Sequence, residues 1–283
     1  MKIHLSNVNF NSSSGPNSFA ARLAHELVKR KYQIVNSNDD YDIFLCFIEP
    51  ASMPKKDCKF IQRLDGIWFK PEEYETHNKN IKTEKYWGSP NKGSVIHNGI
   101  SLGNFEKIHP EVRKIKNKYD RLFVCSASWH RQKRLKENIE FYTKNRRNND
   151  VLLVLGSKPD YIAQEKNIIY LGHVPHEICL QIYSVSDWFI HLAWLDHCPN
   201  VVVEALSQNC PVVCTNSGGT KEIVGSNGII LNEDNEYNFE LTDYDNPYAL
   251  TTGKINLPEV IVNNSYLDIE LVCDKYEEIF KWA

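Results

Sequence analysis

The sequence of 283 residues predicts an α/β protein of two Rossmann-like lobes, each built on a parallel sheet. Short apolar runs alternate with amphipathic segments, which is the pattern of βαβ units. The alternation breaks off in a polar stretch at 72–92 and restarts at Arg121, so we expect one lobe on each side of the break. Hydrophobic residues make up 42% of the chain, which is enough to bury a core in both lobes. Ligands of such sheets bind beyond the carboxyl ends of the strands, and we expect the ligand in a cleft between the lobes.

The first lobe is predicted to contain several strands and one clear helix. The expected strands are 3–5, 32–35, 42–48 and 59–64. In the segment "SFAARLAHELVKR", Phe19, Leu23 and Leu27 recur at helical spacing. Asn17 or Ser18 can cap the start of this helix.

The second lobe is predicted to repeat this architecture without repeating the sequence. The expected strands are 121–128, 151–157, 167–172, 187–193, 211–215 and 228–232, and the expected helices are 134–146, 176–185 and 199–208. The chain closes with "YLDIELVCDKYEEIFKWA", whose apolar residues form a helical stripe. We therefore predict a first lobe at 1–104, a second lobe at 105–265, and a helix at 266–283 that crosses back to the first lobe.

The net charge and the N-terminal segment indicate which partners and which location to expect for the protein. The net charge of −3 gives no global reason to expect nucleic acid or an anionic membrane as partner, although it does not exclude nucleic acid. The N-terminal segment lacks the layout of a signal peptide, and no apolar run reaches the roughly 20 residues that span a bilayer. We therefore expect a cytoplasmic protein, and contact with the surface of a membrane stays open as an alternative.

The eight cysteines include no CxxC pair, so we expect buried thiols and neither a disulfide framework nor a metal site.

A small-residue loop with Gly15 precedes the first predicted helix. Backbone N–H groups at a helix N-terminus, approached by a glycine loop, suit an anion such as phosphate. A plain strand-to-helix turn is an equally good interpretation of this segment alone. The segment is neither a GxGxxG motif nor a P-loop, so an ordinary dinucleotide fold or an NTPase has no motif support here.

The segment "SWHRQKRLK" concentrates cations between a predicted strand and helix, at the rim of the expected cleft. These are Arg131, Lys133, Arg134 and Lys136. Cations placed there would neutralise a diphosphate leaving group. The alternative is a solvated basic helix start, which is the commoner fate of a charge run. The position favours the binding site, because the helix dipole disfavours positive residues in the first turn.

The segment "DHCPNVVVEALSQNCPVV" carries two acids, Asp196 and Glu204. Pro199 suits a first helical turn and Asn209 can take the left-handed conformation that ends a helix, so we predict a short buried helix in spite of the valine run. Glu204 would lie one turn from Asn200, with Asp196 in the loop ahead. Both acids would then face the same space at the carboxyl edge of the preceding strand, where hydroxyl groups of a ligand can bind them.

These segments together resemble one enzyme family. The stretch 196–231, from "DHCPN" to "GIIL", resembles the signature of the family-4 retaining glycosyltransferases of the GT-B fold: an acid, seven residues, a glutamate, a Pro-Val strand and a Gly-Gly-x-x-Glu turn. Similar pieces occur in the expected order, "SGPNSFAARLAHEL", "VIHNGISLGNF", "SWHRQKRL" and "IIYLGHV". The resemblance implies the GT-B architecture, with the acceptor on the first lobe and a nucleotide-sugar donor on the second.

The resemblance also implies roles for single residues. Glu204 matches the acid that holds the nucleotide's ribose hydroxyls, and Asp196 matches the acid that faces the donor sugar, although it is one methylene shorter than the usual glutamate. Lys133 matches the phosphate-binding lysine, and Arg131 is the nearest candidate for the arginine that precedes it. Further donor contacts are implied for Gly15, Val174, His197, Cys198, Pro199, Asn200 and Val201. In the first lobe, Arg63 and Asp65 form either part of the acceptor side or a structural ion pair.

The expected activity is transfer of a sugar from a nucleotide-diphosphate sugar to a hydroxyl acceptor, with retention at the anomeric carbon. The resemblance implies neither a metal nor a cofactor. Three alternatives stay open: a catalytically weak nucleotide-sugar binding protein, an inverting or phosphate-dependent GT-B enzyme, and a transferase that acts on a nucleic-acid base or a protein side chain.

Overall fold

The computed structural model of the protein describes residues 1–12, 14–48, 50–63, 94–159, 162–163, 165–233 and 244–281. The chain forms two compact units. The first comprises Met1–Ser101 and Tyr266–Ala283, and the second comprises Leu102–Ser265. Asp65 and the polar stretch at 72–92 lie outside the described residues.

The first unit is built on a parallel sheet with the strand order β2-β1-β3-β4. Its elements are β1 (Lys2–Ser6), α1 (Gly15–Lys29), β2 (Gln33–Val35), β3 (Ile43–Phe47), β4 (Lys59–Arg63) and α8 (Ile269–Phe280). The four strands predicted for this lobe are confirmed. Every residue of β3 is buried, as expected for a central strand covered on both faces.

Helix α1 begins earlier than the sequence predicted. Ser14 occupies the N-cap position and Pro16 lies in the first turn, where its fixed φ and missing N–H suit the helix start. The expected cap at Asn17 or Ser18 is therefore wrong, and the Asn17 side chain instead accepts a hydrogen bond from the Asn9 amide at 2.8 Å. Gly15 is the first helical residue and not a loop residue.

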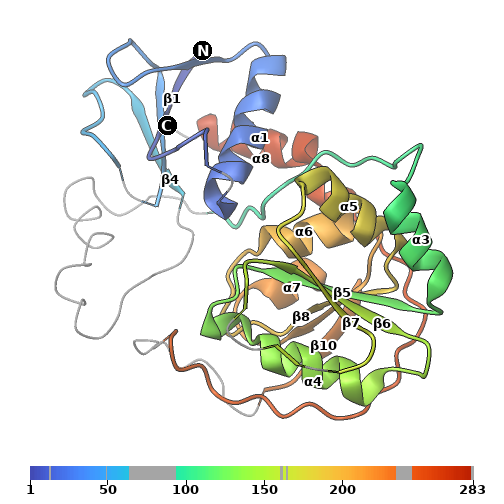
Figure 1. Cartoon of the computed structure of the whole chain (residues 1–283). Helices are drawn as coiled ribbons and strands as arrows, with labels where there is room; N and C mark the ends of the chain where they lie inside the picture. The colour runs from blue at the N-terminus through green and yellow to red at the C-terminus, as the bar shows by residue number, and fades with distance from the viewer. Residues whose placement is uncertain are drawn as a thin grey trace. The chain divides into compact units, whose positions relative to one another are not determined.

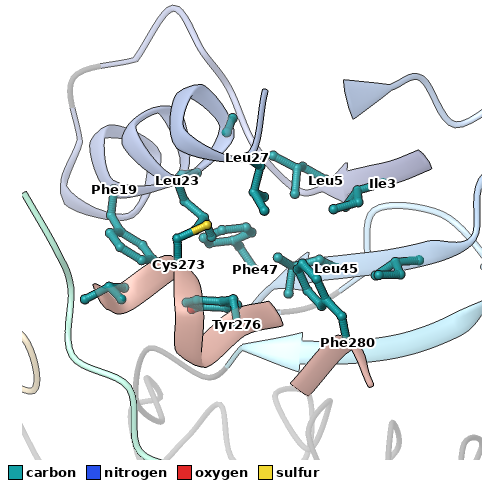
Figure 2. Packing of buried hydrophobic residues seen from close by; sticks show 14 of the residues in the cluster. Ile3, Leu5, Phe19, Leu23, Leu27, Leu45, Phe47, Cys273, Tyr276 and Phe280 are labelled. Carbon is teal, nitrogen blue, oxygen red and sulfur yellow. The ribbon is translucent and has the colours of Figure 1, made fainter. Parts of the chain in front are cut away.

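The core of the first unit lies between its sheet and the helices α1 and α8 (Figure 2). Phe19, Leu23 and Leu27 of α1 are fully buried and pack in one cluster with residues of α8. The residues of α8 in this cluster are Ile269, Val272, Cys273, Tyr276 and Phe280. Burying a large apolar side chain contributes about 1.5–3 kcal/mol, so α8 supplies a substantial share of this core. Although it comes last in the chain, α8 belongs to the first unit.

The second unit contains the strands β5 to β10, most of which are labelled in Figure 1. They form a parallel sheet with the strand order β10-β9-β8-β5-β6-β7. Its elements are α3 (Pro110–Lys118), β5 (Leu122–Ala127), η2 (Arg131–Lys133), α4 (Leu135–Asn145), β6 (Val151–Gly156), β7 (Ile168–Gly172), α5 (His176–Val185), β8 (Trp188–His191), α6 (Asn200–Ser207), β9 (Val212–Thr215), α7 (Thr220–Val224) and β10 (Gly228–Leu231). The strand order reverses direction between β5 and β8. A crevice at the carboxyl ends of the strands on either side of such a reversal is where open α/β sheets bind ligands.

The valine-rich segment after Pro199 is the helix α6, as predicted. Pro199 is its N-cap residue, and Asn209 beyond its end has the left-handed φ of 60°. Six consecutive residues of α6, Val202–Ser207, are buried. Tertiary burial and the two flanking signals therefore outweigh the β propensity of the valines.

Candidate functional site

The loops that follow β5 and β8 meet at the point where the strand order reverses. The short helix η2 with Lys133 follows β5, and Asp196 lies in the loop after β8. A hydrogen bond of 2.7 Å from the Trp194 amide to the Gln132 carbonyl joins the two loops. The parallel sheet places both loops at its carboxyl edge, which accounts for residues 63 positions apart coming together.

Lys133, Asp196 and His191 form one polar cluster at this position. The Lys133 ammonium pairs with Asp196 Oδ2, and His191 Nε2 lies 3.0 Å from the same oxygen. Burial of the Asp196 carboxyl opposes its ionisation, but the charge of Lys133 and the hydrogen bond from His191 outweigh this effect and hold its pKa well below the usual range. Asp196 is therefore a carboxylate at neutral pH.

The backbone around Asp196 is held from a second side by the turn before α7. The Asp196 carbonyl accepts hydrogen bonds from the Gly219 amide at 3.0 Å and from Thr220 Oγ1 at 3.2 Å. A Cβ atom on Gly218 would approach the Asp196 carbonyl oxygen to 2.5 Å, and Gly218 also has a positive φ of 67°. The Gly-Gly pair is thus required for the close approach of the two loops, which fixes the position of Asp196.

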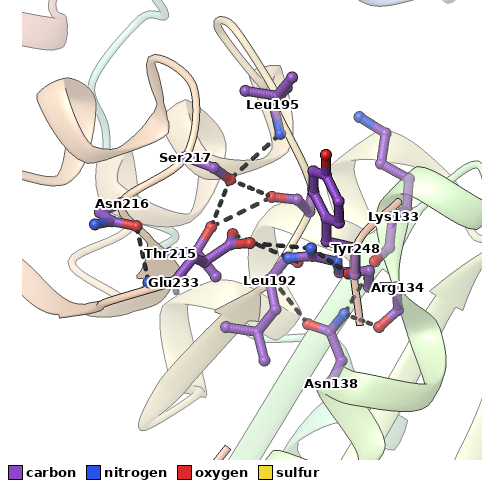
Figure 3. Close-up of polar contacts among 11 residues, drawn as sticks. Lys133, Arg134, Asn138, Leu192, Leu195, Thr215, Asn216, Ser217, Glu233 and Tyr248 are labelled. Atoms are coloured by element: carbon purple, nitrogen blue, oxygen red, sulfur yellow. Dashed lines mark hydrogen bonds and ion pairs between the residues drawn. The ribbon is translucent and has the colours of Figure 1, made fainter. Parts of the chain in front are cut away.

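Arg134 does not lie with the other cations at the rim, contrary to the sequence-based expectation. Its side chain is fully buried, and its guanidinium donates to both carboxylate oxygens of Glu233, at 2.9 and 3.0 Å, and to the Tyr248 carbonyl at 2.6 Å (Figure 3). A left-handed backbone at Arg134, with φ 50°, turns the chain between η2 and α4 and directs this side chain inward. Lys136, by contrast, is exposed on α4 with a long contact to Glu140 of 3.9 Å.

Asn138 is a site-supporting residue that the sequence did not reveal. It is buried on α4, and its Nδ2 donates to the carbonyls of Lys133 at 3.0 Å and Arg134 at 2.7 Å. Its Oδ1 accepts from the Leu192 amide at 3.2 Å. One side chain thus ties the backbone of Lys133 to the segment that leads from β8 to Asp196. A polar residue on the apolar face of a predicted helix was the one signal that could have indicated this role.

The segment 244–248 also reaches the site, although none of the sequence motifs includes it. Arg131 Nη1 lies 3.4 Å from both the Asp245 carbonyl and Asn246 Oδ1, and Tyr244 Oη lies 3.4 Å from His197 Nε2. The Tyr248 ring packs edge-on against Trp194, with centroids 5.2 Å apart. Arg131 remains exposed beside Lys133, and its position is compatible with an anionic ligand.

Glu204 contacts His176, which is not one of the residues paired with Asp196. It is buried on α6, and its Oε1 lies 3.1 Å from Nε2 of His176, the exposed first residue of α5. Burial, and after it the negative charge of Glu204, raise the pKa of the nearby Cys179 thiol to about 11. The two acids thus have different side-chain partners on the same connection after β8, and the expectation that both face one ligand space stays a prediction.

The other residues predicted to contact the nucleotide-sugar donor lie in the loops near Asp196 and Glu204. His197, Cys198 and Pro199 link Asp196 to the start of α6, where Asn200 and Val201 form the first turn. Helix α6 therefore presents its positive dipole end next to the Asp196 loop. Val174 lies between β7 and α5, and its carbonyl is 3.7 Å from the Cys179 sulfur.

Two further predicted site residues, Gly15 and Arg63, lie in the first unit. Gly15 opens helix α1 behind β1. Arg63 ends β4, donates to Asn98 Oδ1 at 2.6 Å, and stacks over the rings of Phe19 and Phe47. These contacts hold Arg63 within the unit, its role on the acceptor side stays a prediction, and the expected pairing with Asp65 concerns a residue outside the described ones.

The presence or absence of metal-binding groups, disulfides, membrane-spanning helices and pockets among the described residues also bears on the kind of site. They contain no group of three or more His, Cys, Asp or Glu side chains that could hold a metal ion, and no disulfide joins any of the cysteines. None of the helices in this part of the chain has both the length and the apolar character needed to cross a membrane. A pocket of about 980 Å³ lies between α3 and the start of α5, and its walls include none of the predicted site residues.

Comparison with known proteins gives a consistent result. The sequence profile of the family "Glycosyl transferases group 1" matches residues 119–240. The protein named as the teichuronic acid biosynthesis glycosyltransferase TuaC of Bacillus subtilis is 25% identical over 143 residues, which cover 49% of this chain and 37% of TuaC. The chain thus aligns with little more than a third of that relative's length.

Solved structures resemble the whole chain. AviGT4, described as a glycosyltransferase involved in avilamycin A biosynthesis, has a TM-score of 0.61 at 15% identity, covering 99% of this chain and 97% of its own. HepE of Anabaena, solved in complex with UDP and glucose, has a TM-score of 0.64 at 12% identity and covers 100% of both chains. At these identities the likeness establishes the fold. The resemblance inferred from the sequence is confirmed at this level: the chain has the fold of the GT-B glycosyltransferases, and its residues 119–240 match the group 1 family of these enzymes.

Proposed function

We propose that the protein is a retaining glycosyltransferase that moves a sugar from a nucleotide-diphosphate sugar to a hydroxyl acceptor. The observation that carries this proposal is the pairing of Lys133 with Asp196 at the strand-order reversal, beside the N-terminus of α6. A cation, a fixed carboxylate and a helix dipole in one place suit a ligand that has both a diphosphate and sugar hydroxyls. The group 1 family match over the same residues supports this assignment.

In the proposed reaction the bond between the anomeric carbon and the diphosphate oxygen breaks, and a bond to the acceptor oxygen forms on the same face. The electron pair leaves with the diphosphate, and the acceptor's proton passes to a phosphate oxygen. Lys133, assisted by Arg131, stabilises the charge that develops on the diphosphate. Asp196 holds hydroxyls of the sugar, and its negative charge stabilises the positive charge that develops on the sugar ring.

The donor is identified most directly by thermal stability. A ligand that binds only the folded protein raises the melting temperature in proportion to the logarithm of its concentration over its Kd. UDP-, GDP-, ADP- and TDP-sugars are added separately to the purified protein. We expect a rise in Tm with one nucleotide class. No rise with any of the four classes would overturn the proposed donor.

Glu204 is proposed to hold the ribose hydroxyls, and its replacement should weaken nucleotide binding. Glu204→Gln keeps the size of the side chain but removes the charged acceptor, and a hydrogen bond to a charged group contributes about 1.5–3 kcal/mol. We therefore expect the Kd for the donor's nucleoside diphosphate, measured by calorimetry, to rise about 10-fold to 100-fold. Glu140→Gln on the outer face of α4 serves as the matched control, and an unchanged Kd for Glu204→Gln would remove Glu204 from the ribose site.

Retention is tested on the product. The anomeric configuration of the transferred sugar is read by proton NMR and compared with the configuration in the donor. The same configuration supports the proposed mechanism, and the opposite one would show that the protein is an inverting enzyme on the same fold.

A further inference from the structure

His191 is a buried histidine with a defined partner at the proposed site. It is the last residue of β8, its side chain is 5% exposed, and its ring stacks on Phe189. Its Nε2 lies 3.0 Å from Asp196 Oδ2. Because a carboxylate can only accept, the hydrogen must be on Nε2, which fixes the tautomer of a neutral His191. None of the sequence motifs had indicated this residue.

The same oxygen of Asp196 is the partner of the Lys133 ammonium. Within the described part of the chain, Lys133 and His191 are the two side chains that bind the Asp196 carboxylate. The Asp196 side chain is only 14% exposed, so water replaces a lost partner poorly. A buried carboxylate that loses its partners is strongly disfavoured.

When the donor binds, its diphosphate competes with the Asp196 carboxylate for the Lys133 ammonium. The adjacent Arg134 cannot replace it at Asp196, because Glu233 and the Tyr248 carbonyl hold its guanidinium. The diphosphate carries more charge than one carboxylate, and it therefore competes well for the ammonium. When Lys133 turns to the diphosphate, His191 is the remaining side-chain partner of Asp196 among these groups.

We infer that His191 is a positioning residue that keeps Asp196 charged and in place while Lys133 binds the donor's diphosphate. The inference rests on the proposed function. It assigns to His191 an indirect role: the histidine touches neither sugar nor phosphate, but it allows Lys133 to leave Asp196. The hydrogen bonds from the Gly219 amide and the Thr220 hydroxyl to the Asp196 carbonyl hold the loop, so the contribution of His191 concerns the carboxylate itself.

The experiment compares His191→Phe, which removes the donor hydrogen, with His191→Gln, which keeps an N–H group near the position of Nε2. Calorimetry is performed with UDP, GDP, ADP and TDP, and the binding of uridine, guanosine, adenosine and thymidine is followed by NMR. We expect His191→Phe to weaken binding of the diphosphate about 10-fold or more, the order of one charge-assisted hydrogen bond. Binding of the matching nucleoside should not change, and His191→Gln should recover most of the lost affinity. His4→Phe is the matched control, since His4 is a strand histidine of the first unit with one ring-nitrogen hydrogen bond.

A second variant separates this role from a structural one. In His191→Phe/Asp196→Asn the carboxylate no longer holds Lys133, so diphosphate affinity should return toward that of the wild type. Equal losses for diphosphate and nucleoside, equal losses in the Phe and Gln variants, no loss at all, or no recovery in the double variant would each overturn the inference. Failure of the wild type to bind UDP, GDP, ADP or TDP would instead overturn the proposed function.

Discussion

Replacing Lys133 with methionine is expected to lower kcat for sugar transfer by about 10²–10³, the cost of removing one preorganised group that stabilises transition-state charge. Methionine keeps most of the apolar stem of Lys133 but cannot neutralise the leaving diphosphate. Because the diphosphate gains charge as the bond to the sugar breaks, the loss should appear more in kcat than in KM. Initial rates are measured with the nucleotide sugar selected by the thermal shift experiment.

Lys136→Met provides the control for this variant. Lys136 comes from the same basic segment but is exposed on α4, with only a long contact to Glu140. Its replacement should leave kcat unchanged. If Lys133→Met also turned over normally while remaining folded by circular dichroism, Lys133 would have no part in stabilising the diphosphate.

The largest effect on stability is expected for Arg134→Met. This change leaves Glu233 buried without its guanidinium partner, and breaking a buried ion pair in this way costs about 3–5 kcal/mol. The free energy of unfolding of the second unit, measured by urea denaturation with circular dichroism and tryptophan fluorescence, should fall by this amount. Most of the cost comes from the unpaired Glu233 carboxylate, and not from the lost attraction.

Two further variants check that explanation. Arg134→Met/Glu233→Leu removes both charges, so it should be clearly more stable than Arg134→Met alone. Arg131→Met removes an exposed arginine with contacts of 3.4 Å, and it should change the free energy of unfolding by less than about 0.5 kcal/mol. A double variant no more stable than Arg134→Met would contradict the assignment of the cost to Glu233.

Local sequence signals were sufficient to predict the six strands of the second unit and its helices α4, α5 and α6, but they did not predict α3 (Pro110–Lys118). The helix at 176–185 has the predicted bounds, and α6 was predicted from Pro199 and Asn209 against the β propensity of its valines. Such signals work because caps, proline and residue periodicity act over a few positions. The start of α1 was missed because two adjacent polar residues were preferred as caps over a serine followed by Gly-Pro.

The support of the site could not be predicted in the same way. Arg134 and Glu233 are 99 positions apart, and Asn138 and Leu192 are 54 apart. Local sequence patterns do not indicate which side chains far apart in the chain will contact each other. For this reason Arg134 was predicted to be one more cation at the rim of the site. Lys133 and Asp196 were both predicted as site residues because two family-like motifs fall on loops at the same sheet edge, but the ion pair between them was not predicted. His191 ends a strand of otherwise apolar residues, so no sequence pattern indicated that its side chain binds Asp196.

The position of α8 sets the order in which the chain can fold during synthesis. Residues 269–280 complete the core around Phe19, Leu23 and Leu27, and Arg30, the C-cap residue of α1, forms an ion pair with Glu277 of α8 at 2.9 Å. A ribosome therefore has to produce the whole second unit before the first unit can close its core. Domains usually fold as they emerge, N-terminal part first. Here we expect the later unit to fold first, with the early strands exposed to chaperones until the last helix docks.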